Sequence, residues 1–136
     1  MTIVASPELV EWWTTPAGED LINAVSALSW TPADSLSSTA QLRRHYPDLT
    51  PEILNGTIDL VQARQRAVEK LGPASAHWFL TLAAVQQATP YAVTHYRSRR
   101  LLSSDSTIAQ PIHDATCSVG TEVAALVPVS YTHLTL

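Results

Sequence analysis

The stretch Pro51–Leu71, PEILNGTIDLVQARQRAVEKL, is the longest helical pattern in the sequence. Thr50 is a preferred N-cap, Pro51 suits the first helical position, and Gly72-Pro73 ends the pattern. The apolar residues on one face are Leu54, Ile58, Val61 and Val68, with Ile53, Leu60 and Leu71 at its flanks. Gly56 inside the pattern costs about 1 kcal/mol relative to Ala. The sequence therefore predicts one long amphipathic helix whose first turn frays.

Shorter helices are predicted before the long helix from the same cap signals. Ser6-Pro7 and Thr15-Pro16 each place an N-cap residue before a proline. The apolar residues of the helix after Thr15 are Leu21, Ile22, Val25 and Leu28. A further segment opens at Thr31–Asp34, with Leu36 and Leu42 as apolar anchors, and breaks at Tyr46-Pro47-Asp48.

The chain after the long helix continues the helical pattern as far as residue 102. We expect a short apolar helix or turn over Ala74–Phe79, a helix over Leu82–Ala88 capped by Thr81, and a last helix from Tyr91 to about Leu102. Residues 15–102 are therefore predicted to form a helical unit without strands.

The pattern changes after Ser103. A polar linker leads to a short strand, Pro111–Asp114, then to a small-residue turn over Thr116–Gly120 and a helix over Thr121–Leu126. Strand, small-residue loop and helix are the opening unit of a doubly wound α/β domain. The expected fold is mainly α, followed by the first strand, loop and helix of a Rossmann-like α/β domain.

Composition and charge exclude several classes of protein. Apolar residues make up 46% and charged residues 15%, and one Cys excludes a disulfide framework and a zinc cage of cysteines. No apolar run approaches the roughly 18 residues of a membrane helix. Residues 1–25 contain no basic residue, so they are not a secretory signal. We expect a soluble cytoplasmic protein with no membrane partner and no metal, since His77 and His95 are isolated.

The net charge of −4 is unevenly distributed. Residues 1–60 carry −6, residues 61–104 carry +5 and residues 105–136 carry −3. A basic middle is able to face a polyanion such as RNA, with Arg97, Arg99 and Arg100 as the contacting residues. A solvated helix surface is the alternative interpretation. Trp12, Trp13, Trp30 and Trp78 are expected to pack in the core rather than to stack on bases.

The segment Ile112–Glu122 is the candidate ligand-binding motif of this sequence. In a nucleotide-binding strand–loop–helix unit, small residues let a ligand approach the backbone, and the helix start offers free N–H groups. Asp114 at the end of the strand is placed to hold a cationic or hydroxyl-bearing part of a ligand. His113 points to the opposite face of the strand from Asp114, so the two do not form an acid–base pair.

This segment resembles motif I of class I S-adenosylmethionine-dependent methyltransferases. Asp114 matches the acidic residue of that motif, and Thr116, Ser118 and Gly120 fall on its three usual glycine positions. A bacterial branch with a THUMP-like C-terminal domain has a Cys-containing version, which Cys117, Gly120, Thr121 and Glu122 fit.

Upstream segments resemble the same branch in order and spacing. They are Gln62–Gly72, Phe79–Thr81, Val85–Pro90 and His95–Arg100, and the resemblance covers about residues 15–127. It implies S-adenosylmethionine as cofactor and RNA as a partner. It also implies a set of cofactor-binding residues: Asp114, Thr116, Cys117, Ser118, Gly120 and Glu122, with Gln87, Thr89 and Tyr91 packing over the pocket.

The last eight residues, Val129–Leu136, resemble a translated sequencing-library adapter. A genuine β-prone terminal strand is the alternative. We therefore divide the chain into a helical domain over 1–103, the start of a cofactor-binding domain over 104–127, and an adapter-derived tail over 128–136. On this interpretation the natural chain continues past Val127, the catalytic residues lie beyond it, and this chain by itself is inactive. A non-catalytic helical interaction module is the alternative function, and the downstream genomic sequence distinguishes the two.

Overall fold

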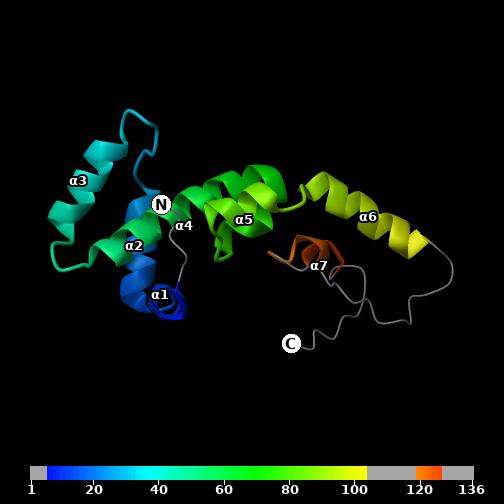
Figure 1. Ribbon diagram of the computed structural model, residues 1–136, viewed down its shortest axis with the longest axis horizontal. Coiled ribbons are helices and arrows are strands. Elements are labelled where there is room, and N and C mark those ends of the chain that lie inside the picture. The colour runs from blue at the N-terminus through cyan, green and yellow to red at the C-terminus, as the bar shows by residue number, and fades with distance from the viewer. Residues whose placement is uncertain (1–5, 104–118, 127–136) are drawn as a thin grey trace.

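The computed structural model describes residues 6–103 and 119–126, and within these two ranges the chain is helical without strands. The elements are α1 (Pro7–Trp13), α2 (Pro16–Ser26), α3 (Ser35–His45), α4 (Pro51–Leu71), the 3₁₀ helix η1 (Pro73–His77), α5 (Leu82–Gln87), α6 (Tyr91–Ser103) and α7 (Thr121–Leu126). Figure 1 shows α4 running along the molecule, with α1 to α3 at one end and α6 and α7 at the other. The prediction of a strand-free helical unit over 15–102 is confirmed.

Four helices begin where the sequence places an N-cap. The hydroxyl oxygens of Ser6, Thr15, Thr50 and Thr81 accept hydrogen bonds from the amides of Leu9, Gly18, Ile53 and Ala84, over 3.3, 3.2, 3.4 and 3.1 Å. Each bond satisfies an amide that has no partner within the helix. Thr31-Pro32, by contrast, opens a turn, and α3 begins at Ser35.

The hydrogen bonds of Asp34 explain why α3 begins at Ser35 and not directly after Thr31-Pro32. Its carboxylate accepts hydrogen bonds from the hydroxyls of Ser29, at 2.8 Å, and Thr31, at 2.6 Å, so it does not cap α3. These bonds hold the 29–34 turn, and they lower the pKa of Asp34, with the Thr31 bond as the larger cause. The expected anchor Leu36 is 86% exposed, which is a correction: α3 turns only Ser38 and Leu42 into the interior.

The first half of α4 forms the main core with α2 and α3. Its buried members are Leu21, Val25, Leu42, Leu54, Ile58 and Val61. The predicted stripe holds for the α4 members of this set but not for Val68, which is 38% exposed. Beyond Val61, α4 is covered on a different face, by η1 and α5, and it buries Ala63, Ala67 and Leu71 against Leu80, Val85 and Ala88.

Gly56 lies where α1 packs against α4. A Cβ at this position would lie 2.6 Å from Leu9 Cδ2, so the absence of a side chain allows this contact. Leu9, Trp13 and Leu60 form a small buried cluster there. The predicted fraying of the first turn is not observed, because Thr50 caps α4 and its carbonyl accepts from the Leu54 amide at 3.1 Å.

The four tryptophans pack as expected. Trp13 is 3% exposed, and Trp12, Trp30 and Trp78 are half-buried against the hydrophobic clusters. The Trp13 indole N–H donates to Thr57 Oγ1 at 2.8 Å, and that of Trp30 donates to the Val25 carbonyl at 2.8 Å. Each buried indole therefore satisfies its polar group while its rings fill the core.

The strand predicted over Pro111–Asp114 lies outside the described residues, as do most of the small-residue loop and the tail 128–136. The domain division at residues 103 and 127 therefore stays a prediction. The helix predicted over Thr121–Leu126 is confirmed as α7. None of the helices within the described ranges combines the length and apolarity needed to cross a membrane.

Candidate functional site

The predicted cofactor-binding residues fall into two groups. Asp114, Thr116, Cys117 and Ser118 lie outside the described residues. The others are at the start of α7 and around the α5–α6 junction, and they are Gly120, Glu122, Gln87, Thr89 and Tyr91.

Gly120 has a backbone conformation that favours glycine. Its φ is 74°, in the left-handed region where side chains with a Cβ are strained. Its carbonyl accepts from the Ala124 amide at 2.8 Å and so starts α7. The chain thus turns into α7 at the last glycine position of the segment that resembles motif I, Asp114–Glu122, which is called the motif-like segment below.

Glu122 pairs with Arg97. Their Oε1 and Nη1 atoms are 2.7 Å apart, with the side chains 25% and 58% exposed. This contact joins α7 to α6. It brings together one residue predicted to bind cofactor and one predicted to bind RNA, and it engages both charges within the protein.

Tyr91 and Thr121 line the same small cavity, which has a volume of about 70 Å³. The cavity lies among the ends of α4 and η1, the first turn of α6 and the helix α7, and Leu71, Trp78 and Thr94 are also in its lining. Tyr91 stacks on His95 with ring centroids 5.4 Å apart. Ligand pockets typically span about 300–1,000 Å³. The cavity therefore provides one edge of a pocket and does not enclose a cofactor.

The positions of Gln87 and Thr89 do not link them to a cavity beside α7. Gln87 is exposed at the end of α5, and within the described ranges its side chain makes no hydrogen bond. Thr89 is half-buried just before α6. Of the three residues predicted to pack over the pocket, Tyr91 alone shares a described cavity with α7.

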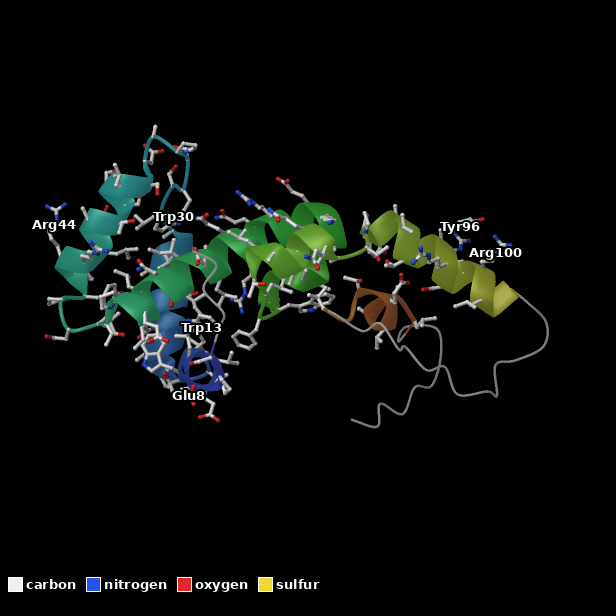
Figure 2. The ribbon with its side chains drawn as sticks, in the orientation of Figure 1. Glu8, Trp13, Trp30, Arg44, Tyr96 and Arg100 are labelled. Atoms are coloured by element: carbon white, nitrogen blue, oxygen red, sulfur yellow. The ribbon has the colours of Figure 1, made fainter. Side chains whose placement is uncertain are left out.

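The predicted RNA-contacting residues lie on α6. Arg97, Arg99 and Arg100 are all exposed, and Figure 2 shows Tyr96 and Arg100 projecting from the same side of this helix. Arg97 is already engaged by Glu122.

Two other basic residues of the middle segment also have internal partners. Lys70 Nζ donates to the carbonyls of Val85, at 2.9 Å, and Gln86, at 2.6 Å, near the C-terminus of α5. Arg64 donates to the carbonyls of His77, the last residue of η1, and of Trp78, which follows it. The charge of +5 in residues 61–104 therefore overstates what is offered to a polyanion.

The sequence reasoning missed Arg64 as an individual residue. It stands three residues after Val61 and four before Val68, so it interrupts the predicted apolar stripe of α4. A charged residue in that position was the available signal. Within the described ranges, no group of three or more His, Cys, Asp or Glu side chains is arranged to hold a metal ion.

Comparison with known proteins gives two findings. Residues 6–67 match a domain family described as a domain of unknown function, DUF8688. The chain is also 38% identical over 90 residues to two curated proteins of Mycobacterium tuberculosis, from strains CDC 1551 / Oshkosh and ATCC 25618 / H37Rv, each named an uncharacterized S-adenosylmethionine-dependent methyltransferase.

The match covers 62% of this chain and 22% of each relative, so the chain spans about a fifth of the length of the curated relatives. No solved structure gives a significant match. The names of these two relatives agree with the resemblance to S-adenosylmethionine-dependent methyltransferases.

Proposed function

We propose that this chain is the N-terminal part of an S-adenosylmethionine-dependent methyltransferase of the THUMP-like-domain-containing kind. The observation that carries the proposal is the 38% identity over 90 residues to two proteins of that activity by name. The segment Asp114–Glu122 also supports it, because the predicted strand and small-residue loop, followed by the helix α7, suit a nucleotide-type ligand.

In this proposal, residues 1–103 form a helical domain and residues 104–127 begin the cofactor-binding domain. Asp114, Thr116, Cys117 and Ser118 hold the methionine end of the cofactor, together with Gly120 and Glu122. The positive φ of Gly120 fits this role, because a residue without a side chain at this turn lets a ligand approach the backbone at the start of α7. When bound, S-adenosylmethionine supplies an electrophilic methyl group.

The described residues form one edge of the proposed cofactor site. Tyr91 and Thr121 share a cavity of about 70 Å³, which supports the expectation that the start of α6 packs over the pocket. The Glu122 carboxylate pairs with Arg97 through Oε1, so Glu122 lies at the junction of α7 and α6, beside the proposed cofactor site. This chain positions one end of the cofactor, and we expect it not to transfer methyl groups by itself.

RNA is the proposed substrate class. The support is the three exposed arginines of α6, which are Arg97, Arg99 and Arg100, with Arg97 already paired with Glu122. Phosphate contacts by such residues weaken as salt increases. We therefore expect binding of the 136-residue chain to RNA to fall steeply between low and physiological salt.

A non-catalytic helical interaction module is the second candidate. The observation in its favour is the helical unit itself, whose main core, among the described residues, is built from α2, α3 and α4. Such a module binds a partner without needing cofactor.

The test starts with the genomic sequence downstream of the Val127 codon, read in the same frame. A continuing series of strand–helix units, with an acidic residue after the second strand, supports the enzyme; a stop codon supports the module. The encoded product is then assayed for transfer of radiolabelled methyl groups from S-adenosylmethionine to bulk RNA, with the 136-residue chain as the comparison.

Point variants of that product locate the site. Asp114→Ala removes a charged acceptor and should weaken cofactor binding by roughly 10- to 150-fold in calorimetry. Gly120→Val should do comparable harm through the left-handed backbone at that position. Arg99→Ala should leave cofactor affinity unchanged and weaken only RNA binding. If Arg99→Ala lowers cofactor affinity and Asp114→Ala does not, the site has been placed on the wrong segment.

A further inference from the structure

Arg64 is a half-buried cation that is held rigidly at one edge. Its Nε donates to the Trp78 carbonyl at 2.9 Å and its Nη2 to the His77 carbonyl at 3.2 Å. The Phe79 ring lies 5.4 Å from the guanidinium carbon, and Phe79 in turn stacks on Trp13 at 5.9 Å with the rings 6° apart. One side of the guanidinium fork is therefore fixed by consecutive backbone carbonyls and by an aromatic ring.

The other donors of Arg64 remain available. A guanidinium has five N–H donors, and two are used here. The rest are both N–H groups of Nη1 and one of Nη2, which form the end-on fork that a carboxylate or phosphate accepts with two oxygens. Within the described ranges Arg64 has no acidic partner. Burial lowers the pKa of the guanidinium, so a bound negative charge would offset its lost hydration.

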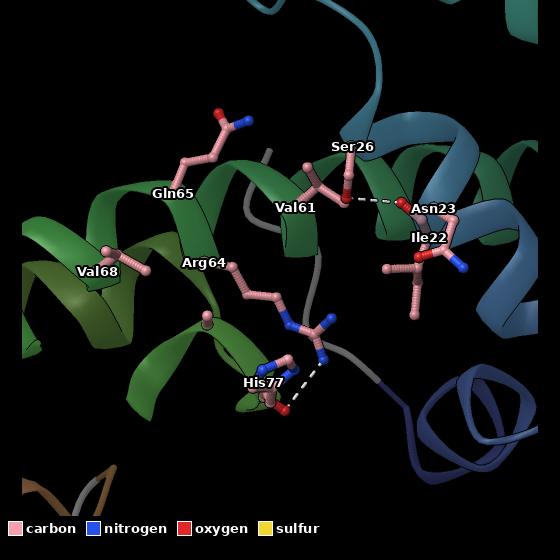
Figure 3. A pocket seen from close by; sticks show the side chains of 9 residues that line it. Ile22, Asn23, Ser26, Val61, Arg64, Gln65, Val68 and His77 are labelled. Atoms are coloured by element: carbon pink, nitrogen blue, oxygen red, sulfur yellow. Dashed lines mark hydrogen bonds between the residues drawn. The ribbon is translucent and has the colours of Figure 1, made fainter. Parts of the chain in front are cut away.

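A hollow of about 280 Å³ lies beside this group, between α2, α4 and η1. Its polar lining includes Asn23, Ser26 and His77, its apolar lining includes Ile22, Val61 and Val68, and no Asp or Glu takes part. Figure 3 shows the Arg64 guanidinium lying between His77 and the side chains of Ile22 and Asn23. The hollow thus combines one oriented cation with an apolar surface.

The surroundings disfavour a polyanion. A second hollow of about 380 Å³ shares Ile22, Asn23, Arg64 and His77 with the first, and Glu19 is in its lining. Residues 1–60, which contribute α2, carry a net charge of −6. A nucleic acid passing over this face would meet repulsion on the α2 side of Arg64, whereas a compact ligand with a single anionic group would not reach that side.

We propose that this hollow binds a small molecule that carries one oxyanion, a carboxylate or a phosphate, on an apolar or aromatic body. The oxyanion accepts from the end-on fork of Arg64, and the body lies on Ile22, Val61 and Val68. Because Arg64 is already immobilised by His77, Trp78 and Phe79, little side-chain entropy is lost when the ligand binds. The site shares α4 and η1 with the cavity near α7 but is lined by different residues, and it does not depend on methyltransferase activity.

The experiment titrates the full 136-residue chain, isotopically labelled, with benzoate and separately with inorganic phosphate, at constant ionic strength balanced with chloride. Shifts of the Asn23, Ser26 and His77 amide signals report binding. Benzoate-induced shifts identify a carboxylate on an aromatic body as the ligand type, and phosphate-induced shifts alone identify a phosphate-bearing ligand.

Two variants test the geometry, each with a matched control. Arg64→Lys keeps the charge but loses the fork and should weaken binding by about tenfold or more, whereas Arg66→Lys, at an exposed position two residues away, should not. Asn23→Asp places a negative charge in the hollow and should weaken binding by about fivefold. Asn55→Asp makes the same change outside the hollow and should leave binding unchanged.

The outcomes are decisive in both directions. Loss of binding in Arg64→Lys and Asn23→Asp, with both controls intact, supports the site. Binding of neither probe, or equal affinity of the parent and Asn23→Asp, overturns it. If Arg64→Lys fails to fold by circular dichroism, Asn23→Asp, an exposed isosteric change, carries the test alone. Arg64-dependent binding of single-stranded RNA without binding of either small probe also overturns the proposal.

Discussion

Helix α4 begins at a proline, helix α6 directly follows one, and both contain large apolar residues, yet the first half of α4 and helix α6 bury different kinds of side chain. In α4, Leu54, Ile58 and Val61 are 2%, 8% and 2% exposed. Among residues 91–101 of α6, the buried ones are Thr94 and Ser98, at 1% and 2%, while Tyr91 and Tyr96 are 50% and 63% exposed.

The hydroxyls of Thr94 and Ser98 explain how α6 tolerates this. They donate to the carbonyls of Tyr91, at 2.9 Å, and Thr94, at 2.8 Å, within the same helix, so neither needs a partner on α7. Small side chains let α7 approach closely, but they bury little apolar area. We therefore expect the α4 region to carry most of the stability and the α6–α7 pair to contribute little.

The largest effect is expected from Leu54→Ala. Removing a large, fully buried side chain from the main core should lower the free energy of unfolding by about 2–5 kcal/mol in chemical denaturation. Tyr96→Ala, which truncates a larger side chain on α6, should change it by less than about 0.5 kcal/mol, because that residue is exposed. Equal losses from the two variants would contradict the unequal roles of the two regions.

Thr57→Val should have the next largest effect. It removes the acceptor for the buried Trp13 indole N–H, which should cost about 1–3 kcal/mol in the free energy of unfolding. Thr94→Val is the matched change in α6 and should cost less than about 1 kcal/mol, since only a bond within one helix turn is lost. Thermal unfolding followed by circular dichroism gives both values, and a larger loss for Thr94→Val would be the unexpected result.

Gly120→Ala should have a local effect. The left-handed φ of 74° should cost roughly 1–2 kcal/mol with a Cβ present, and this should appear as faster hydrogen exchange of the α7 amides only. Gly72→Ala is the control at the junction of α4 and η1, where φ is 92°. It should lower the stability of the whole helical unit, because Leu71 beside it belongs to the second core cluster. Global destabilisation by Gly120→Ala would show that α7 is part of the main cooperative unit.

The smallest effect is expected at the Arg97–Glu122 pair. The pair is partly solvent-exposed, so Arg97→Gln should change stability by about 0–1 kcal/mol, and the effect should shrink in high salt. A double-mutant cycle with Glu122→Gln isolates the pair itself. A coupling energy above about 2 kcal/mol would mean that this contact, rather than close packing, holds α7 against α6.

The cofactor-binding role of the candidate site stays a prediction, but the structure shows where some of its residues lie. Gly120 was singled out from its place in a small-residue motif, and its positive φ agrees with a special conformation there. Tyr91 was linked to the pocket, and it shares a cavity with Thr121. The pairing of Glu122 with Arg97 was not predictable, because the two residues are 25 positions apart and each was assigned a different ligand. The assignments of Asp114, Thr116, Cys117 and Ser118 stay predictions.

The sequence by itself determined where most of the described helices begin and end, with the start of α3 as an exception. Capping is local chemistry: Thr50-Pro51 and Gly72-Pro73 bound α4 because an N-cap oxygen and a terminal glycine act on amides and carbonyls a few residues away. Only the tertiary structure decided which faces are buried. Val68 and Leu36 fit apolar patterns and lie exposed, whereas Thr94 and Ser98 are polar and buried. Burial depends on which element covers a face, and that choice rests on contacts such as Leu9 against Gly56, between residues far apart in the chain.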